Sequence, residues 1–406
     1  MEGTGVYPQN RNYQEEIMLK REDGFSLVEL LVTMAVFVFV MAAASTVFTG
    51  LLTQFKQQSK QAETNIEGIV GLEIMRQDIE GAGYGLAWNG FVTYSEAAGD
   101  PFGFNDAPTD APRAIISKNN ATFSGSNSIF GGTDYLVVRS VTVARNAASD
   151  KWTTLSSASP YVRTWTTAGE SAPLSENLQP TDRVIVISPN GSAGNPRQLI
   201  VDGSSFFSQF SSVGVASSPW LPSVSAVEET RIVYGVDPKT NLRMPFNRAD
   251  YFIRRYDSSG NSVTPARCAP NTGVLEKAVV NHSGGTFDYL PLLECVADMQ
   301  VIYGMDLDSD GDFEPGVSGS TDGYSEDLTA STAQTIREQV KQVRVYILAH
   351  DGQKDTTFTY PSSTISLGGD VSLGRTFNLA SAIGNPEYKN YRWKIYTIVV
   401  TPNNLE

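Results

Sequence analysis

The pattern of hydrophobic and polar positions divides the chain into one long apolar run near the N-terminus and a polar remainder with short apolar bursts. The run extends from Phe25 to Leu52, directly after "KREDG". As an α-helix with ~1.5 Å rise per residue it measures roughly 42 Å, more than the ~30 Å hydrocarbon thickness of a bilayer. The run therefore predicts a membrane-spanning helix over residues 25–52. One carboxylate, Glu29, lies inside it, and because such a group is costly within a membrane, it is expected to have a partner.

The pattern alone leaves three possible roles for this apolar segment. It can be an ordinary membrane anchor, or a segment that is processed and then packed against other helices. It can also be a secretory signal peptide, since Ala42 and Ala44 in "MAAAS" form an A-x-A arrangement. The apolar character continues past that site through "TVFTGLL", which argues against the signal peptide.

After residue 52 the chain becomes polar without a proline or a turn cluster, so the same helix is expected to continue over residues 53–86. Gly68 and Gly71 are expected to weaken this helix locally, and "GAGYG" at residues 81–85 to end it. Apolar residues recur there at spacings of three and four, which predicts a stripe that faces a globular body. The stripe comprises Ile66, Ile69, Val70, Leu72, Met75 and Ile79.

The remainder, residues 87–406, is rich in Gly, Ser, Thr, Asn and Pro and contains β-branched and aromatic bursts typical of strands. The bursts are "DYLVVRSVTVAR", "DRVIVIS", "TRIVYGV", "DYFIRRY", "MQVIYGM", "QVRVYILA" and "KIYTIVVT". Turn residues separate them. We therefore expect an α+β protein in which a long N-terminal helix packs on a mainly antiparallel β-sheet body with large β-rich insertions.

Charge and cysteine content narrow the function classes. A formal net charge of -14 and a pI near 4.7 argue against a nucleic-acid-binding face. The two cysteines, Cys268 and Cys295, fit one disulfide of an exported domain, with two unpaired buried thiols as the alternative. A zinc site would need both cysteines to converge with His282 and His350, so we do not expect one.

The templates of enzyme active sites find no counterpart in the sequence. It contains no G-x-S-x-G elbow, no Walker loop, no H-E-x-x-H and no C-x-x-C. The two histidines, His282 and His350, lie in turn-like polar text and are expected at the surface. Arg76 and Asp78 are likewise expected on the solvated face of the long helix. We therefore expect a protein that is not an enzyme.

An acidic ladder follows one predicted strand, in "VIYGMDLDSDGDFEPG". Its carboxylates match the D-x-D-x-D-G opening of a calcium loop, in which alternate residues point oxygens inward and the glycine allows the bend. The glutamate expected at the twelfth position is absent, so a further ligand would come from Glu314 or from Asp322, Glu326 or Asp327. A solvated acidic turn is the alternative to structural Ca²⁺. The candidate ligands are Asp306, Asp308, Asp310, Asp312 and Glu314.

The start of the apolar run resembles a known processing signal. "DGFSLVELL" is similar to the signal of type IV prepilins and of type II secretion pseudopilins. The resemblance implies that a prepilin peptidase removes a leader, residues 1–24, by cutting between Gly24 and Phe25, and methylates the new amine of Phe25. Glu29 would then offer its carboxylate to the terminal amine of a neighbouring subunit. Because "MLKREDG" is by itself a compact leader, translation starting at Met18 is a second hypothesis.

The end of the helix adds to this resemblance. "LEIMRQDIEGAGYG" resembles the corresponding segment of PilW-like minor pilins, and these proteins and several pseudopilins carry a similar acidic loop after a "YG" strand. The resemblance implies a pilin-like fold and a single-pass inner-membrane subunit with a periplasmic domain that later joins the pilus. Such a subunit helps to initiate pilus assembly at or near the tip with other minor pilins and the major pilin. The alternatives are a GspJ-like minor pseudopilin of a type II secretion system and a membrane-anchored adhesin.

Overall fold

The computed structural model of the chain describes residues 24–123, 129–159, 161–165, 175–190, 196–211, 215, 217–222 and 229–405. Apart from Gly24, the expected leader and the alternative start at Met18 lie outside the described residues. The chain divides into two compact units, residues 1–58 and residues 59–406. The first part of the long helix belongs to the first unit, and its last part belongs to the second.

The predicted long helix is α1, Leu27–Glu80. It contains no proline, and the predicted end is confirmed, because the "GAGYG" segment begins directly after Glu80. Gly83 and Gly85 in that segment have φ values of 84° and 69°, which glycine adopts without the strain that a side chain would add. The Gly83 N–H donates to the carbonyl of Arg139 at 2.9 Å, so the turn also attaches the helix end to a strand.

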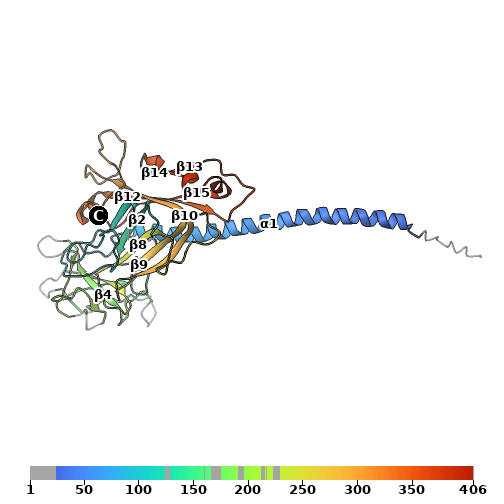
Figure 1. Ribbon diagram of the computed structural model, residues 1–406. Helices are drawn as coiled ribbons and strands as arrows, with labels where there is room; N and C mark the ends of the chain where they lie inside the picture. Colours follow the sequence, from blue (N-terminus) through green and yellow to red (C-terminus); the bar gives the residue numbers. More distant parts are fainter. Residues whose placement is uncertain are drawn as a thin grey trace, which may run out of the picture. The chain divides into compact units, whose positions relative to one another are not determined.

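The main sheet has eight strands, and each pairing between them is antiparallel. Figure 1 labels six of them, β2, β8, β9, β10, β12 and β15. Their order is β1-β2-β8-β9-β10-β12-β15, and β11 pairs with the end of β10. The strands are β1 (Ile115–Ala121), β2 (Thr133–Ser140), β8 (Asn247–Arg254), β9 (Gly273–Val280), β10 (Phe287–Met305), β11 (Gly323–Ser325), β12 (Val340–Asp351) and β15 (Arg392–Val400). The α+β class with an antiparallel body is thereby confirmed.

A second, five-stranded sheet comes from the chain between β2 and β8 and is one of the expected β-rich insertions. Its path is β3-β7-β4-β5, with β6 paired to β4. The strands are β3 (Trp152–Leu155), β4 (Arg183–Ser188), β5 (Gln198–Leu199), β6 (Ser208–Gln209) and β7 (Arg231–Asp237). Apolar residues of this sheet, among them Ile185 and Tyr234, share one hydrophobic core with the main sheet and the end of α1.

Short elements complete the second unit. A two-stranded sheet pairs β13 with β14, and helix α2 precedes β12 directly in the chain. The elements are α2 (Ala333–Gln339), β13 (Thr364–Leu367), η2 (Gly369–Val371), β14 (Arg375–Asn378), α3 (Leu379–Ala382) and η3 (Glu387–Asn390). The Thr332 side chain caps α2 by accepting a hydrogen bond from the Thr335 N–H.

The apolar stripe of α1 packs on the body only in its last part. Leu72, Met75 and Ile79 are buried, as predicted. The prediction is wrong for three residues further up the helix, which are exposed: Ile66, Ile69 and Val70. At 3.6 residues per turn Ile66 and Val70 lie roughly a third of a turn or more away from the buried stripe, so the helix face that packs on the body does not include these two residues.

Close contact between α1 and β10 explains the two glycines that the sequence marked as weak points. A Cβ on Gly71 would lie 2.0 Å from the carbonyl oxygen of Leu292, and one on Gly68 would lie 2.8 Å from the Leu293 Cδ1. A side chain at Gly71 therefore meets backbone that cannot move aside. The glycines cost helix propensity and in return allow the helix backbone to touch the sheet.

Candidate functional site

The expected processing site lies in an open segment ahead of α1. Gly24, Phe25 and Ser26 have no regular structure, and the Phe25 side chain is 84% exposed. A Cβ built on Gly24 meets nothing within 4 Å. The described part of the fold therefore places no steric demand for glycine at this position.

Glu29 closes a capping box at the start of α1. The Ser26 N–H donates to Oε2 of Glu29 at 3.0 Å, and the Glu29 N–H donates to Oγ of Ser26 at 3.2 Å. This is the reciprocal S-x-x-E arrangement that satisfies the free N–H groups of a helix start. The signal was present in "SLVE" and was missed. The contact holds the carboxylate beside the segment that carries Phe25.

The apolar part of α1 is uncovered over its whole length. The stretch Leu27–Lys56 has a mean hydropathy of 2.5 in its most apolar window, none of which is buried. Thirty residues of such a helix meet the length that a bilayer requires. Because water is an unfavourable solvent for this surface, the helix is suited to a lipid bilayer or to contact with other apolar helices.

Asp78 attaches the end of α1 to the main sheet through a buried charge cluster. Its carboxylate lies 2.5 Å from the Nζ of Lys277 on β9 and 2.9 Å from Nη2 of Arg145. The Tyr251 hydroxyl on β8 also donates to it. Asp78 is only 5% exposed, so the expectation of a solvated position is wrong. It lies between Met75 and Ile79 on the buried helix face, where Lys277 and Arg145 compensate its charge.

The expectation of a solvated position is confirmed for Arg76, which lies two residues before Asp78. Arg76 is partly exposed, and its partners among the described residues lie on its own helix, Glu73 at 2.8 Å and Glu80 at 2.9 Å. The two charges of "RQD" therefore have different environments. In the cluster, burial lowers the pKa of Lys277 despite the opposing effect of Asp78, and burial raises the pKa of Tyr251 well above its ordinary value.

A second buried charge network ties the segment before β1 to the main sheet, and sequence reasoning missed it. Oε2 of Glu96 accepts hydrogen bonds from Arg139 on β2 at 2.8 Å and from Arg248 on β8 at 3.1 Å. Arg248 also bonds to Asp250 at 2.7 Å. Burial alone would raise the pKa of Glu96, but the two guanidinium groups hold that pKa below its ordinary value. The sequence hinted at this network only through the arginines inside two apolar strand segments, Arg139 on β2 and Arg248 on β8, both of which are buried.

The acidic loop brings three carboxylates together. Oxygens of Asp306, Asp308 and Asp322 all lie within 4.8 Å of one another, so two of the predicted ligands meet one residue of the later acidic group. Asp306 is buried at the end of β10 and accepts hydrogen bonds from the N–H groups of Ser309 at 2.6 Å and Gly311 at 3.0 Å. Oxygen ligands from both ends of one loop are what a hard cation such as Ca²⁺ prefers.

The other acidic candidates are not part of this group. Asp310 accepts from the Asp312 N–H at 3.0 Å, and neither residue nor Glu314 belongs to the cluster. Glu326 bonds to Asn119 at 2.9 Å on another part of the body. Calcium binding remains a prediction, and its ligand set in this structure would be Asp306 and Asp308 with Asp322.

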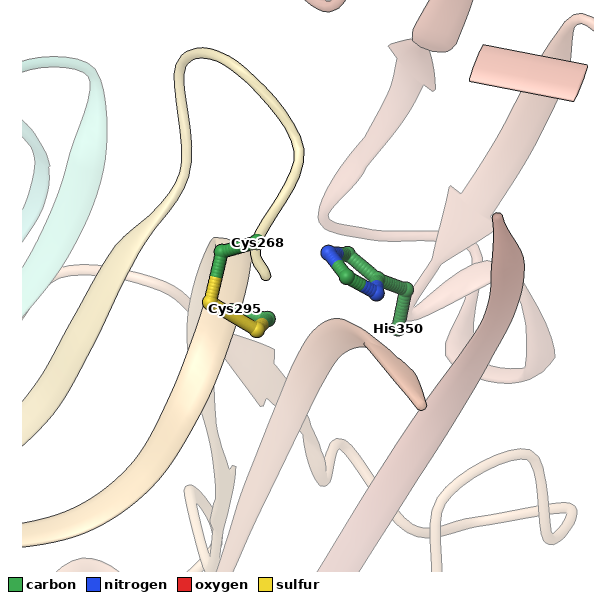
Figure 2. Close-up of side chains that lie close together, drawn as sticks. All are labelled: Cys268, Cys295 and His350. Carbon is green, nitrogen blue, oxygen red and sulfur yellow. A yellow bond between two sulfur atoms is a disulfide. The ribbon is translucent and has the colours of Figure 1, made fainter. Parts of the chain in front are cut away.

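The predicted disulfide is confirmed. Cys268 and Cys295 are bonded, with their Cα atoms 4.9 Å apart, and the bridge joins the segment before β9 to β10. Figure 2 shows the His350 side chain beside the bridge, and its nitrogen and the two sulfur atoms lie within 4.8 Å of one another. Because the sulfur atoms are bonded to each other, these three residues form a covalent brace packed on an imidazole and not a set of thiolate ligands.

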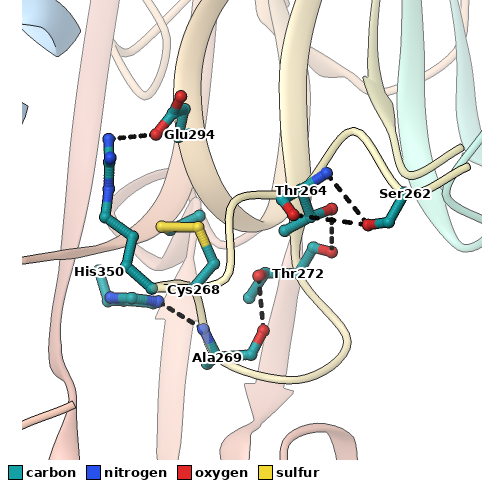
Figure 3. The surroundings of a disulfide bond; sticks show 9 residues. Ser262, Thr264, Cys268, Ala269, Thr272, Glu294 and His350 are labelled. Atoms are coloured by element: carbon teal, nitrogen blue, oxygen red, sulfur yellow. Dashed lines mark hydrogen bonds and ion pairs between the residues drawn. A yellow bond between two sulfur atoms is a disulfide. The ribbon is translucent and has the colours of Figure 1, made fainter. Parts of the chain in front are cut away.

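Both histidines are buried, so the prediction that they lie at the surface is wrong. His350 is on β12, where Nε2 accepts from the Ala269 N–H at 2.8 Å (Figure 3). Its ring lies 4.5 Å from that of Tyr391. Nδ1 of His282 accepts from the Arg243 N–H at 3.2 Å. Burial lowers the pKa of His350 to about 3 and that of His282 to about 4, so both are neutral acceptors at neutral pH.

Comparison with known families gives two matches. Residues 19–45 match the family model described as "Prokaryotic N-terminal methylation motif". Residues 250–404 match the model described as "Type IV Pilus-assembly protein W". The second match spans β8 to β15 and so includes the disulfide, the acidic loop and α2.

No curated protein and no solved structure matches the chain. The two family matches agree with the structure, since the first covers the capping box at the start of the uncovered apolar helix. The second covers six of the eight strands of the main sheet, among them β8, β9 and β10, which contact the end of this helix. Together these two matches, which cover less than half of the chain, support a PilW-like prepilin related to the minor pilins of type IV pili.

Proposed function

We propose that the mature chain, from Phe25 onward, is a minor subunit of a type IV pilus that helps to initiate pilus assembly at or near the tip. A prepilin peptidase would cut between Gly24 and Phe25 and methylate the new amine. Other minor pilins and the major pilin would be its partners. The inner membrane would hold the subunit before assembly, with the globular body in the periplasm.

The uncovered apolar helix carries this proposal. Leu27–Lys56 is too apolar for water and has no cover among the described residues of its own chain, so it needs a lipid environment and then the helices of other subunits. A helix that only anchors a domain gains from this carboxylate no more than the capping contact with Ser26. A helix that leaves the membrane for a filament gains a partner, because an amine from another chain offsets the desolvation of Glu29.

The position of Glu29 bears on the place of the subunit in the filament. Its carboxylate would pair with the terminal amine of the subunit ahead. At the outermost position no subunit lies ahead to supply that amine. We therefore place the subunit within the tip complex but not at its end. A body of this size repeated along a shaft would crowd its neighbours, which favours a minor subunit over a major one.

The disulfide supports the proposed compartment. Bridges such as Cys268–Cys295 persist in oxidising environments, which include the bacterial periplasm and the cell surface. The match to the pilus-assembly family over residues 250–404 favours a pilus over a type II secretion system.

N-terminal sequencing of the protein purified from membranes tests the processing step. We expect the mature chain to begin with N-methylated Phe25. An N-terminus at Ser45 would show a secretory signal peptide instead, and an uncut leader would show a plain anchor. Either result overturns the proposal.

A further inference from the structure

Two cavities on the second unit meet at one pair of stacked side chains. Their volumes are about 680 and 600 Å³, and both are lined by Trp88, Gln334 and Arg337. Helix α2 supplies Gln334 and Arg337. Residues of the acidic loop, among them Ser309, line the larger cavity, and Asp110 lines the smaller one. Together they form a polar groove with the size of a binding site for several small rings.

Arg337 is the cation of this groove that lies over Trp88. Its guanidinium carbon lies 4.6 Å from the centre of the Trp88 ring, which also has Arg197 at 5.4 Å. No carboxylate among the described residues forms an ion pair with Arg337. Burial lowers the pKa of Arg337 despite the opposing effect of the neighbouring Glu338, and Arg197 lowers it further, so the half-buried cation is only partly compensated.

The stacked geometry suits one kind of ligand group. A guanidinium lying on an indole is fixed in orientation and keeps the N–H groups of its edge for other acceptors. A planar carboxylate can accept two such hydrogen bonds at once. Arg337 is therefore prepared for a carboxylate at the point where the two cavities meet.

The acidic side chains of the groove limit how much negative charge a ligand can carry. Asp106 bonds to Arg113 at 2.8 Å, and Glu338 accepts from Gln334 at 2.7 Å. Asp110 is exposed. These carboxylates would repel a polyanion, but they can accept hydrogen bonds from hydroxyl groups. A ligand with many hydroxyls and one carboxylate fits both observations.

We propose that this groove binds a saccharide that carries one carboxylate, with the acid on the edge of Arg337 and the sugar hydroxyls on the acidic and amide side chains along the walls. The Oδ1 atom of Asn89 is one such acceptor, since its amide Nδ2 already donates to the Pro196 carbonyl at 2.9 Å. This ligand site is independent of the filament role and does not rest on it.

The test uses the full-length protein in a zwitterionic detergent without a sugar headgroup. The probes are sialyllactose, which carries one carboxylate, and lactose, its neutral counterpart, with affinity measured by ligand-observed NMR titration. We expect sialyllactose to bind about tenfold or more tightly than lactose, since a hydrogen-bonded charge contributes on that scale. Arg337→Ala should lose this difference, and Arg337→Lys should recover only part of it.

Arg163→Ala is the matched control, because Arg163 also stacks on a tryptophan, at 4.1 Å from Trp165, but does not line the groove. It should bind sialyllactose like the unaltered protein. Equal affinity for the two sugars, no binding of either, or an equal loss in both arginine variants would overturn the proposal. Circular dichroism of each variant shows that a loss does not come from unfolding, and Arg337→Lys provides a second reading if Arg337→Ala misfolds.

Discussion

At the scale of single residues, Glu29 has one contact inside its own chain and is proposed to have another between chains. Two substitutions can distinguish the effect of the capping contact with Ser26 from that of the proposed contact with another subunit. Glu29→Val removes the carboxylate, and Ser26→Ala breaks the hydrogen bond from the Glu29 N–H to Oγ of Ser26 but leaves the carboxylate in place. The cap itself is worth only about 1 kcal/mol.

We expect Glu29→Val to insert into the membrane normally and to enter filaments poorly, because no group then pairs with the amine of the subunit ahead. Ser26→Ala should enter filaments nearly as well as the unaltered protein. Immunoblots of membrane and sheared pilus fractions measure both. Normal incorporation of Glu29→Val would contradict the filament role, and equal defects in both variants would show that only the cap matters.

Asp78 offers a second residue-scale prediction. Asp78→Asn leaves the Lys277 ammonium, which is 2% exposed, without its counter-charge, and breaking such a buried pair costs roughly 3–5 kcal/mol. Arg76→Ala is the control, since its exposed pairs contribute about 1 kcal/mol or less. Urea unfolding of the purified protein should show this contrast. Similar small losses in both variants would mean that the cluster does not hold the helix, and Lys277→Met added to Asp78→Asn should restore part of the stability.

These residues also show what the sequence reveals at this scale. Gly24, Phe25 and Glu29 form a short local pattern that can be read without a structure. Asp78 and Glu96 cannot be assigned in that way, because their partners are 199 and 43 positions away. From the sequence alone a carboxylate is predicted to be exposed to solvent, because the cations that make its burial possible are brought to it only by the fold.

At the scale of elements, seven of the strands were predictable from the sequence, whereas others such as β1 and β9, and the grouping of the strands into sheets, were not. Local alternation and β-branched content mark β2, β4, β7, β8, β10, β12 and β15 in the sequence. Nothing local assigns β4 and β7 to a separate sheet, because that depends on pairing across long stretches of chain. The close contact of α1 with β10 was equally hidden, since a glycine such as Gly71 reads as a weak point until the Leu292 carbonyl lies against it.

The acidic loop gives the element-scale prediction. If Asp306, Asp308 and Asp322 hold Ca²⁺, millimolar Ca²⁺ should raise the melting temperature of the purified protein by at least a few degrees over EDTA, because a ligand at 100 times its Kd contributes about 2.7 kcal/mol. Asp308→Asn should abolish the shift. Asp257→Asn, at an exposed turn outside the loop, should retain it. Identical melting curves in Ca²⁺ and EDTA would leave the loop as a solvated acidic turn.

At the scale of the whole molecule, the buried histidines make stability depend on pH. The ordinary histidine pKa is 6.5, and that of folded His350 is about 3. Between these values the unfolded chain binds a proton that the folded chain does not. The contribution of His350 is therefore complete above pH 6.5 and is lost as the pH falls toward 3, by about 1.4 kcal/mol per pH unit. His282 acts in the same direction but only down to about pH 4.

A buried carboxylate opposes this trend. Burial raises the pKa of Asp134 to about 7 from 3.8. The folded chain then binds the extra proton between these values, so this contribution falls as the pH rises. The free energy of unfolding therefore contains contributions that rise with pH, from the histidines, and one that falls with pH, from Asp134. The contribution of one histidine can be isolated only by comparison with a variant that lacks it.

His350→Gln provides that comparison, since glutamine keeps an acceptor for the Ala269 N–H but does not titrate. The variant loses the ring contact with Tyr391, which lowers its stability by an amount that does not depend on pH. Urea unfolding from pH 7.5 to 4.5 should show the difference between the two proteins shrinking by about 1.4 kcal/mol for each unit below 6.5, because only the unaltered chain then gains a proton on unfolding. A constant difference over this range would show that His350 takes up its proton in the folded protein. Water would then reach the imidazole beside the Cys268–Cys295 bridge, and the surroundings of the disulfide would not be as dry as their burial indicates.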